Sequence, residues 1–208
     1  LYISNAVQQG DASLSPEKNS AFKIGTRYRQ TGFSAVLSGF YTHGKDMIDW
    51  VQTTETELTD SKYHVMNIGK LDNMGFNVDA EIYMNELLPR CFVTNIRLGY
   101  AYINQNHETE TEILKSLYAL EYLRHKAVFG LDHKIWSKLS ASWSVRWQQR
   151  MNGYHPYTKV DCKVMWNDRK YSVYVKADNI TCHRYYDLSA VKQPGLWVMA
   201  GVSVNLGW

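Results

Sequence analysis

The stretch LSASWSVRWQ, residues 139–148, alternates strictly between apolar and polar side chains. A period of two is typical of a β-strand with one apolar and one polar face. Three further stretches alternate as regularly, and five alternate more weakly: residues 75–83, 171–178 and 198–208, then 22–28, 33–42, 92–103, 126–136 and 160–166. The pattern predicts an all-β chain of nine strands with no convincing helix, and residues 112–123 are interpreted as a loop.

The connections between the predicted strands alternate between short and long. The short ones lie at residues 29–32, 84–91, 137–138 and 167–170, and the long ones at 5–19, 46–68, 105–122, 150–158 and 181–196. Short turns at one end and long loops at the other are typical of an antiparallel up-and-down meander. A soluble sandwich would mix both lengths at both ends.

Composition narrows the class of protein. The chain has 208 residues, of which 45% are hydrophobic and 21% charged, and these values exclude wholesale disorder. A net charge of +3 is small for a dedicated nucleic-acid protein, so no nucleic-acid partner is expected. The sequence has no apolar run of the ~20 residues that a transmembrane helix needs, but alternating strands remain compatible with a membrane β-barrel.

Aromatic side chains cluster at both ends of the predicted strands. Those beside the short turns are Tyr28, Phe33, Tyr83, Phe92, Trp136, Trp166, Tyr171 and Trp208, and those near the long loops are Tyr41, Tyr102 and Trp147. Strict alternation places Trp136 on the polar face, unlike most of the others. Two such bands resemble the aromatic girdles that flank the apolar zone of a membrane barrel.

The sequence offers no motif for catalysis or for a metal. The seven histidines lack metal-binding spacing, no G-x-S-x-G elbow is present, and the three cysteines form no CxxC pair. Asp79 and Glu81 could do acid–base chemistry, but they fit better as wall residues of a polar lumen. We therefore expect no enzyme, no catalytic residue, no metal and no cofactor.

Several short motifs follow one another along the chain. They include LSPEK at residues 14–18, Asp46-Met47-Ile48, YLRHK at 122–126, Ala177-Asp178-Asn179 and QPGLW at 193–197. In order and spacing they resemble the TonB-dependent outer-membrane receptors, most closely the cobalamin-receptor-like group of Bacteroidetes type. The resemblance implies a 22-stranded barrel that encloses an N-terminal plug. Residues 1–208 would then be the C-terminal segment of the transmembrane barrel, without the plug domain and the first barrel strands.

The same resemblance implies a function and a set of partners. The chain would be part of an active transporter in the cell outer membrane for a scarce nutrient such as cobalamin, a siderophore or heme. Its partners would be outer-membrane lipid, its own plug and remaining strands, TonB through the missing N-terminal part, and the nutrient ligand. A surface lipoprotein would be one further candidate partner.

Two sets of residues are candidate site residues on this interpretation. The polar faces would line the lumen with Asp79, Glu81, Arg97, Arg146, Asp161, Lys176 and Asp178. The long extracellular loops would contact ligand, because aromatic and polar side chains suit a bulky amphipathic molecule. The loop candidates are Trp50, Tyr63, His107, Tyr154, His155, Tyr157, Tyr185 and Tyr186, several of which could instead anchor the outer girdle.

A soluble β-sandwich that binds glycans through aromatic side chains is the alternative. The apolar face distinguishes the two folds, because a sandwich would enclose that face in one core and a membrane barrel would expose it to lipid. The side chains in question are Trp143, Val145, Val173, Val175, Val202 and Val204.

Overall fold

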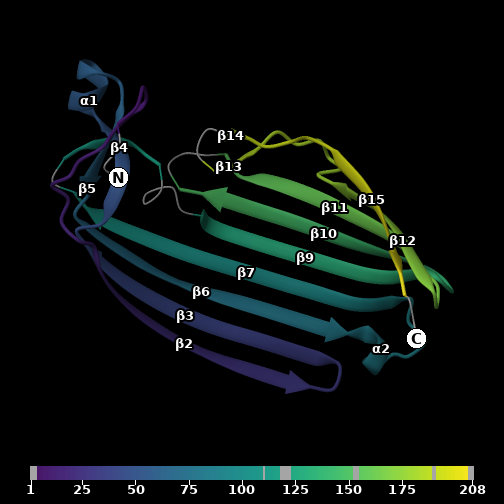
Figure 1. Cartoon of the computed structure of the whole chain (residues 1–208). Helices are drawn as coiled ribbons and strands as arrows, with labels where there is room; N and C mark the ends of the chain where they lie inside the picture. Colours follow the sequence, from purple (N-terminus) through teal and green to yellow (C-terminus); the bar gives the residue numbers. More distant parts are fainter. Residues whose placement is uncertain (1–3, 110, 118–122, 152–154, 189–190, 206–208) are drawn as a thin grey trace.

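A computed structural model describes residues 4–109, 111–117, 123–151, 155–188 and 191–205. Its main element is a nine-stranded sheet in the order β15-β12-β11-β10-β9-β7-β6-β3-β2, in which every pair is antiparallel. The strands are β2 (Lys18–Gln30), β3 (Phe33–Lys45), β6 (Lys70–Tyr83), β7 (Val93–Glu108), β9 (Leu123–Trp136), β10 (Leu139–Arg150), β11 (Tyr157–Asn167), β12 (Tyr171–Asp178) and β15 (Trp197–Val204). The predicted nine-stranded meander is confirmed, and the sheet curves like part of a barrel wall (Figure 1).

A second, four-stranded sheet lies at the long-loop end of the large one (Figure 1). Its order is β1-β5-β4-β8, and helix α1 (Thr54–Thr59) follows β4. The bounds are β1 (Gln8–Gln9), β4 (Ile48–Thr53), β5 (Tyr63–Asn67) and β8 (Ile113–Ser116). The interpretation of residues 112–123 as a loop is therefore wrong at β8, and the predicted loop at residues 46–68 is folded.

A cluster of buried core residues lies where the small sheet meets the long-loop end of the large one. Val51, Ile68 and Leu71 form it, and Met47, Met66 and Ile113 pack around them. Asp49 is only 1% exposed and accepts a hydrogen bond from the Ser116 hydroxyl of β8. The segments at this long-loop end are thus packed together and do not form a set of open loops.

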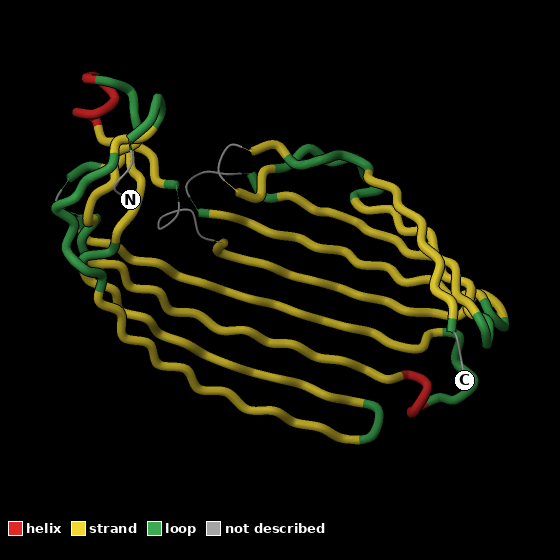
Figure 2. The backbone as a smooth tube through the Cα atoms, in the orientation of Figure 1, coloured by secondary structure: helices red, strands yellow, loops and turns green. Residues whose placement is uncertain are grey.

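The remaining elements are short. Strands β13 (Tyr186–Leu188) and β14 (Val191–Lys192) form a hairpin beside the long-loop ends of β10 and β11 (Figure 2). Helix α2 (Met84–Leu87) lies in the short connection between β6 and β7. None of the helices in the described ranges is long and apolar enough to cross a membrane.

The apolar face of the large sheet is open. Val164, Val175 and Ala200 lie side by side across β11, β12 and β15. Val175 is 50% exposed and Val202 67%, whereas a sandwich would bury both between two sheets. The structure therefore does not support the sandwich alternative.

Two pairs of polar side chains on the apolar face are hydrogen-bonded to each other. The Trp143 indole Nε1 donates a hydrogen bond to His133 Nε2 at 3.2 Å. The Tyr100 hydroxyl and His125 Nδ1 lie 2.8 Å apart. Such pairing lowers the cost of placing a polar group away from water, because an unsatisfied polar group in an apolar environment is costly.

A register shift changes the predicted position of Trp136. Ser140 lies opposite Lys134, but Leu139 lies opposite Trp136, so β9 has one extra residue at this point. The irregularity returns Trp136 to the face of Leu139 and Trp166, which are themselves opposite each other. The placement of Trp136 on the polar face by strict alternation is therefore wrong, and the aromatic band at the short-turn end continues through it.

Replacing Gly32 with alanine is expected to destabilise the β2–β3 turn by about 1–2 kcal/mol. Gly32 has φ +75°, and an added Cβ would lie 2.4 Å from Leu87 Cγ of α2. Urea unfolding of the full-length receptor in lipid measures the effect, and Thr31→Ala in the same turn is the matched control. An unchanged unfolding midpoint for Gly32→Ala would show that the turn tolerates both the strain and the contact.

Candidate functional site: the polar face and the long-loop end

The polar face of the large sheet is its hollow side. A cavity of about 670 Å³ lies on this face, lined from β2, β3, β6, β7, β9 and β10. Asp79, Glu81 and Arg97 line it. The register places Arg146 opposite Val128, another lining residue, and Asp161 opposite the lining Ser144.

The other two predicted wall residues, Lys176 and Asp178, share this face further along the sheet. Lys176 lies opposite Lys163, which is two residues from Asp161 on the same face of β11. All seven candidates therefore lie on one side of the large sheet.

Ion pairs and hydrogen bonds organise the wall beside the cavity. Arg97 forms a two-pronged pair with Asp132, with Nη1–Oδ2 at 2.7 Å and Nη2–Oδ1 at 3.1 Å. Its side chain lies across Gly130, where an added Cβ would be 3.0 Å from Arg97 Nε. Glu81 accepts hydrogen bonds from the Tyr83 hydroxyl at 2.7 Å and from Asn95 Nδ2 at 2.6 Å.

A second group of charges lies on β11 and β12. Lys159 Nζ is 3.4 Å from Asp161 Oδ1, and these two side chains are only 13% and 12% exposed. Lys176 and Asp178 form an ion pair at 2.9 Å. Each of these two carboxylates thus has a cation beside it.

Three aromatic rings stack at the long-loop end of β11. The ring centroids of Tyr157 and Tyr185 are 4.5 Å apart. The His183 ring also stacks with Tyr157, at a centroid distance of 6.3 Å. Tyr157 is only 6% exposed and Tyr185 8%. The two candidates thus lie together at the long-loop end, and their buried rings pack against each other rather than face solvent.

Asn179 is the centre of the segment that follows β12. Its Nδ2 donates to the carbonyl oxygens of His183 at 2.9 Å and Pro194 at 3.2 Å. Its Oδ1 accepts from the Thr181 hydroxyl at 3.2 Å and the His183 N–H at 3.1 Å. The Asn179 N–H in turn donates to Asp161 Oδ1 at 2.8 Å, which links the loop to the polar face.

The other loop candidates are distributed over several elements. Trp50 lies in β4 opposite Val65, and Tyr63 lies in β5 opposite Gln8. His107 lies near the end of β7 opposite Leu71.

Three candidates lie closer to the end of the chain. Tyr186 belongs to β13 and is 43% exposed, and its carbonyl oxygen accepts a hydrogen bond from Arg150 Nη1 at 3.4 Å. His155 is exposed ahead of β11, and Tyr154 lies outside the described residues.

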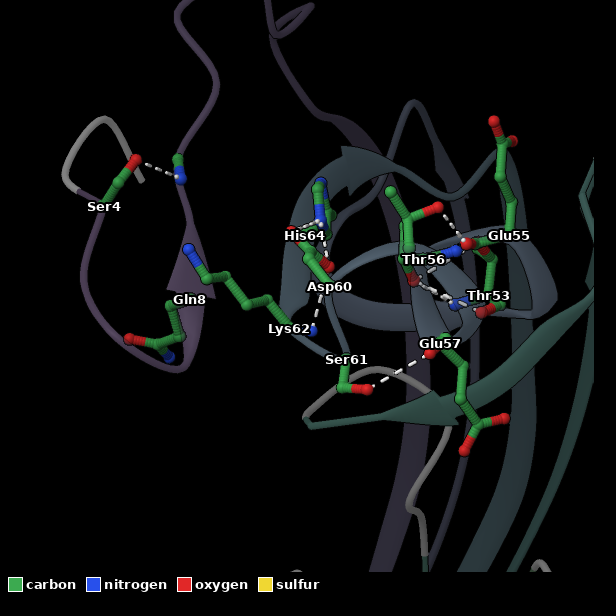
Figure 3. A network of polar contacts seen from close by, with 12 residues as sticks. Ser4, Gln8, Thr53, Glu55, Thr56, Glu57, Asp60, Ser61, Lys62 and His64 are labelled. Atoms are coloured by element: carbon green, nitrogen blue, oxygen red, sulfur yellow. Dashed lines mark hydrogen bonds and ion pairs between the residues drawn. The ribbon is translucent and has the colours of Figure 1, made fainter.

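Figure 3 shows a network of polar contacts around helix α1 and the turn that follows it. The sequence pattern did not indicate this network. Thr53 caps the helix, because its hydroxyl accepts from the Thr56 N–H at 3.3 Å. Asp60 accepts from the Lys62 N–H at 3.0 Å and contacts His64 Nε2 at 3.1 Å. The Lys62 N–H first, and then His64, hold the pKa of Asp60 below its ordinary value. In the described ranges no three His, Cys, Asp or Glu side chains gather closely enough to bind a metal.

Several solved structures share this fold. Their sequence identity to the chain is low, so the similarity concerns the fold alone. The copper transporter OprC matches with a TM-score of 0.71 and 15% identity, over 94% of this chain and 33% of OprC. The FrpB iron transporter from Neisseria meningitidis (F3-3 variant) matches with a TM-score of 0.69 and 16% identity, over 94% and 31%. The siderophore receptor PirA from Pseudomonas aeruginosa matches with a TM-score of 0.63 and 15% identity, over 95% and 31%. The chain thus spans about a third of the length of the structures it matches.

The sequence itself matches one family profile over most of its length. The profile is described as "TonB dependent receptor-like, beta-barrel" and covers residues 1–180. The nine-stranded meander, the open apolar face and the hollow polar face agree with a barrel wall. The chain therefore belongs to the TonB-dependent receptor β-barrel family, whose members are integral barrels of the outer membrane.

Proposed function

We propose that the chain supplies wall and outer ligand-binding loops to a TonB-dependent transporter that imports a scarce nutrient. Residues 1–208 would be the C-terminal segment of a 22-stranded barrel, with a plug and the first strands contributed by the rest of the receptor. The observation that supports this most is the division of one curved sheet into an exposed apolar face and a hollow polar face. The first would meet lipid, and the second would line the lumen around the plug.

The outer end of the chain and the solved structures that match it support a proposal about the class of nutrient. The solved structures that match are named as transporters of copper and iron and as receptors for siderophores, one of them in complex with enterobactin. We propose that the nutrient is a metal-bearing compound, such as a siderophore complex, heme or cobalamin. Exposed aromatic side chains at the long-loop end, such as Tyr186, provide flat apolar surface for it.

The transport cycle requires partners outside this chain. The plug and the loops would hold the ligand, TonB would act through the N-terminal part of the receptor, and a surface lipoprotein would assist capture. The chain's own residues would bind and orient the ligand and maintain the wall. Receptors of this family are transporters and not enzymes.

Uptake by the full-length receptor in outer-membrane vesicles and in cells tests the function. Labelled ferric siderophore, heme and cobalamin are offered separately, with and without TonB. At least one should bind in both backgrounds and accumulate in the periplasm only with TonB. Binding of none of them, or accumulation that does not depend on TonB, would contradict the proposal.

A matched pair of tyrosine variants tests the position of the ligand site. Tyr186 and Tyr171 are both 43% exposed, but Tyr186 lies in the β13–β14 hairpin at the long-loop end and Tyr171 begins β12 at the short-turn end. Tyr186→Ala should weaken binding about 5- to 30-fold, which corresponds to the loss of ~1–2 kcal/mol of aromatic contact. Tyr171→Ala should leave the dissociation constant unchanged. Equal effects of the two would place the site elsewhere.

A further inference from the structure

The two ends of the large sheet differ in charge. The four short connections contain five Lys and Arg residues and only two Asp and Glu residues, whereas the five long connections contain six and twelve. The short-turn end is therefore basic and the long-loop end acidic. Because the short turns of outer-membrane barrels face the periplasm, the basic end lies beside the inner leaflet of the membrane.

Two of the short turns are joined to each other, and we call them the paired turns (residues 137–138 and 167–170). The Asn167 N–H donates to the Lys138 carbonyl oxygen at 2.8 Å, and the side chains of Lys138 and Asp168 form an ion pair. Asp168 Oδ1 also accepts a hydrogen bond from the Arg169 N–H at 2.6 Å. The carboxylate is thus engaged inside the paired turns, and the exposed side chains of Arg169 and Lys170 give them a net positive charge.

Aromatic side chains on the lipid side stand next to the paired turns. Trp136 and Trp166 lie on either side of Leu139 on the apolar face, and Tyr171 begins β12 on the same face. Trp136 is 77% exposed, so its ring is open to the surroundings of the wall. Tryptophan and tyrosine rings favour the headgroup level of a membrane, and these three residues therefore mark that depth.

Lys138 lies close to this group of rings. The hydrogen bond to Asp168 is the main cause that raises the pKa of Lys138, and the charge of Asp168 and the nearby Tyr171 hydroxyl act in the same direction. The ion pair between the two turns is therefore on the side of the wall that carries the lipid-facing rings.

The other two cations reach the depth of lipid phosphate groups. Lys170 directly precedes Tyr171, and Arg169 is three residues beyond Trp166. With a rise of about 3.3 Å per residue, these backbone positions are roughly 3–10 Å beyond the rings. Long basic side chains can extend over an apolar surface while their charged ends stay in a polar layer.

An anionic phospholipid has the chemistry that fits this arrangement. Its phosphate oxygens can accept two parallel hydrogen bonds from a guanidinium group and further bonds from an ammonium group. Its acyl chains would lie along the rings of Trp136 and Trp166. A zwitterionic phospholipid fits less well, because its own ammonium group offsets the charge of its phosphate.

We propose that the paired turns and the three aromatic residues beside them form a binding site for an anionic phospholipid of the inner leaflet, such as phosphatidylglycerol. Arg169 and Lys170 bind the phosphate, and Lys138 neutralises Asp168, which would otherwise repel it. The inference goes beyond the proposed function, because it concerns the membrane around the wall. It rests on the place of the barrel in the outer membrane and not on transport.

Photolabelling of the full-length receptor tests the site. The receptor is placed in vesicles of phosphatidylethanolamine that contain a small fraction of photoreactive phosphatidylglycerol, or of phosphatidylethanolamine with the same reactive group. Mass spectrometry should find peptides of the paired turns labelled roughly 5- to 30-fold more by the anionic probe, since each basic residue near anionic lipid contributes about a fivefold preference. Equal labelling by the two probes would overturn the inference.

A matched pair of lysine variants tests the location. Lys134 is at the same end of the sheet but lies opposite Ser140 on the polar face. Lys170→Gln should lower the preference for the anionic probe about fivefold, and Lys134→Gln should leave it unchanged. Equal losses would show a diffuse attraction to every cation at this end, and no site at the paired turns.

Two further variants separate the loss of charge from a change in folding. Arg169→Gln/Lys170→Gln should remove most of the preference, whereas Arg169→Lys/Lys170→Arg keeps both charges and should retain most of it. Loss of the preference in both would mean that the charge of the paired turns does not hold the lipid, which would overturn the inference.

Inorganic phosphate distinguishes a lipid site from a site for free phosphate. Added at the concentration of the lipid phosphate, it should leave the labelling unchanged, because it cannot replace the contacts of the acyl chains. Labelling that disappears when phosphate is added would show that the paired turns bind the free ion and that the phospholipid site is wrong. Nutrient is absent throughout, so failure of this inference leaves the proposed transport function untouched.

Discussion

Val175→Arg is expected to destabilise the full-length receptor by about 2–4 kcal/mol and to lower its yield in the outer membrane. Val175 lies near the middle of β12, is 50% exposed, and has Val164 and Ala200 as its neighbours across the sheet. On the lipid side, a guanidinium at this depth would lose its water without gaining a partner. Urea unfolding in bilayers measures the change.

The matched control places the same charge on the other face. Ser144 lies near the middle of β10, lines the cavity and is on the polar side. Ser144→Arg should cost less than about 1 kcal/mol, because lumen-facing substitutions do not place a charge in lipid. Equal losses for the two variants, or a silent Val175→Arg, would show that the assignment of the faces is wrong.

Asn179→Ala is expected to loosen the segment between β12 and β15 and to weaken ligand binding. The side chain makes four hydrogen bonds within the segment. The residue also has φ +54°, a conformation that asparagine tolerates better than alanine. Loss of these buried bonds, with strain of about 1–2 kcal/mol, should reduce local stability by roughly 2–4 kcal/mol.

Hydrogen exchange of the Gln193 amide measures this effect, because that amide donates to the Tyr185 carbonyl at 2.9 Å within the same segment. Exchange should accelerate in Asn179→Ala while the amides of β10 keep their protection. Asn179→Gly separates the two causes, since glycine removes the side-chain bonds without the backbone strain. Unchanged exchange in both variants would mean that the aromatic stack alone holds the segment.

The large sheet was predictable because its strands are long and one face of each is apolar. Over the eight to sixteen residues of such strands a period of two is detectable even where the alternation is weaker, and it predicts all nine strands. The small sheet was not predictable in the same way. β4, β5 and β8 are only four to six residues long, and β8 pairs with β4, which is distant in sequence, so local alternation carries little signal.

The candidate site residues likewise divide into those that the sequence could predict and those that it could not. The wall residues could be named because side-chain direction follows from alternation, until an extra residue interrupts it, as at Trp136. Tyr157 and Tyr185 could be named as aromatic loop residues, but their burial depends on stacking between segments 28 residues apart. Asn179 belongs to a motif noted in the sequence, yet its role depends on carbonyl groups as far away as Pro194.

The alternation of lipid contact along β12 tests the barrel-wall account most directly. Spin labels are attached to single cysteines at positions 172–176 of the full-length receptor in bilayers, after serine replaces Cys91, Cys162 and Cys182. Accessibility to oxygen, which dissolves in lipid, should be high at Val173 and Val175 and lower at Ser172, Tyr174 and Lys176. Uniform accessibility, or the opposite alternation, would contradict the account.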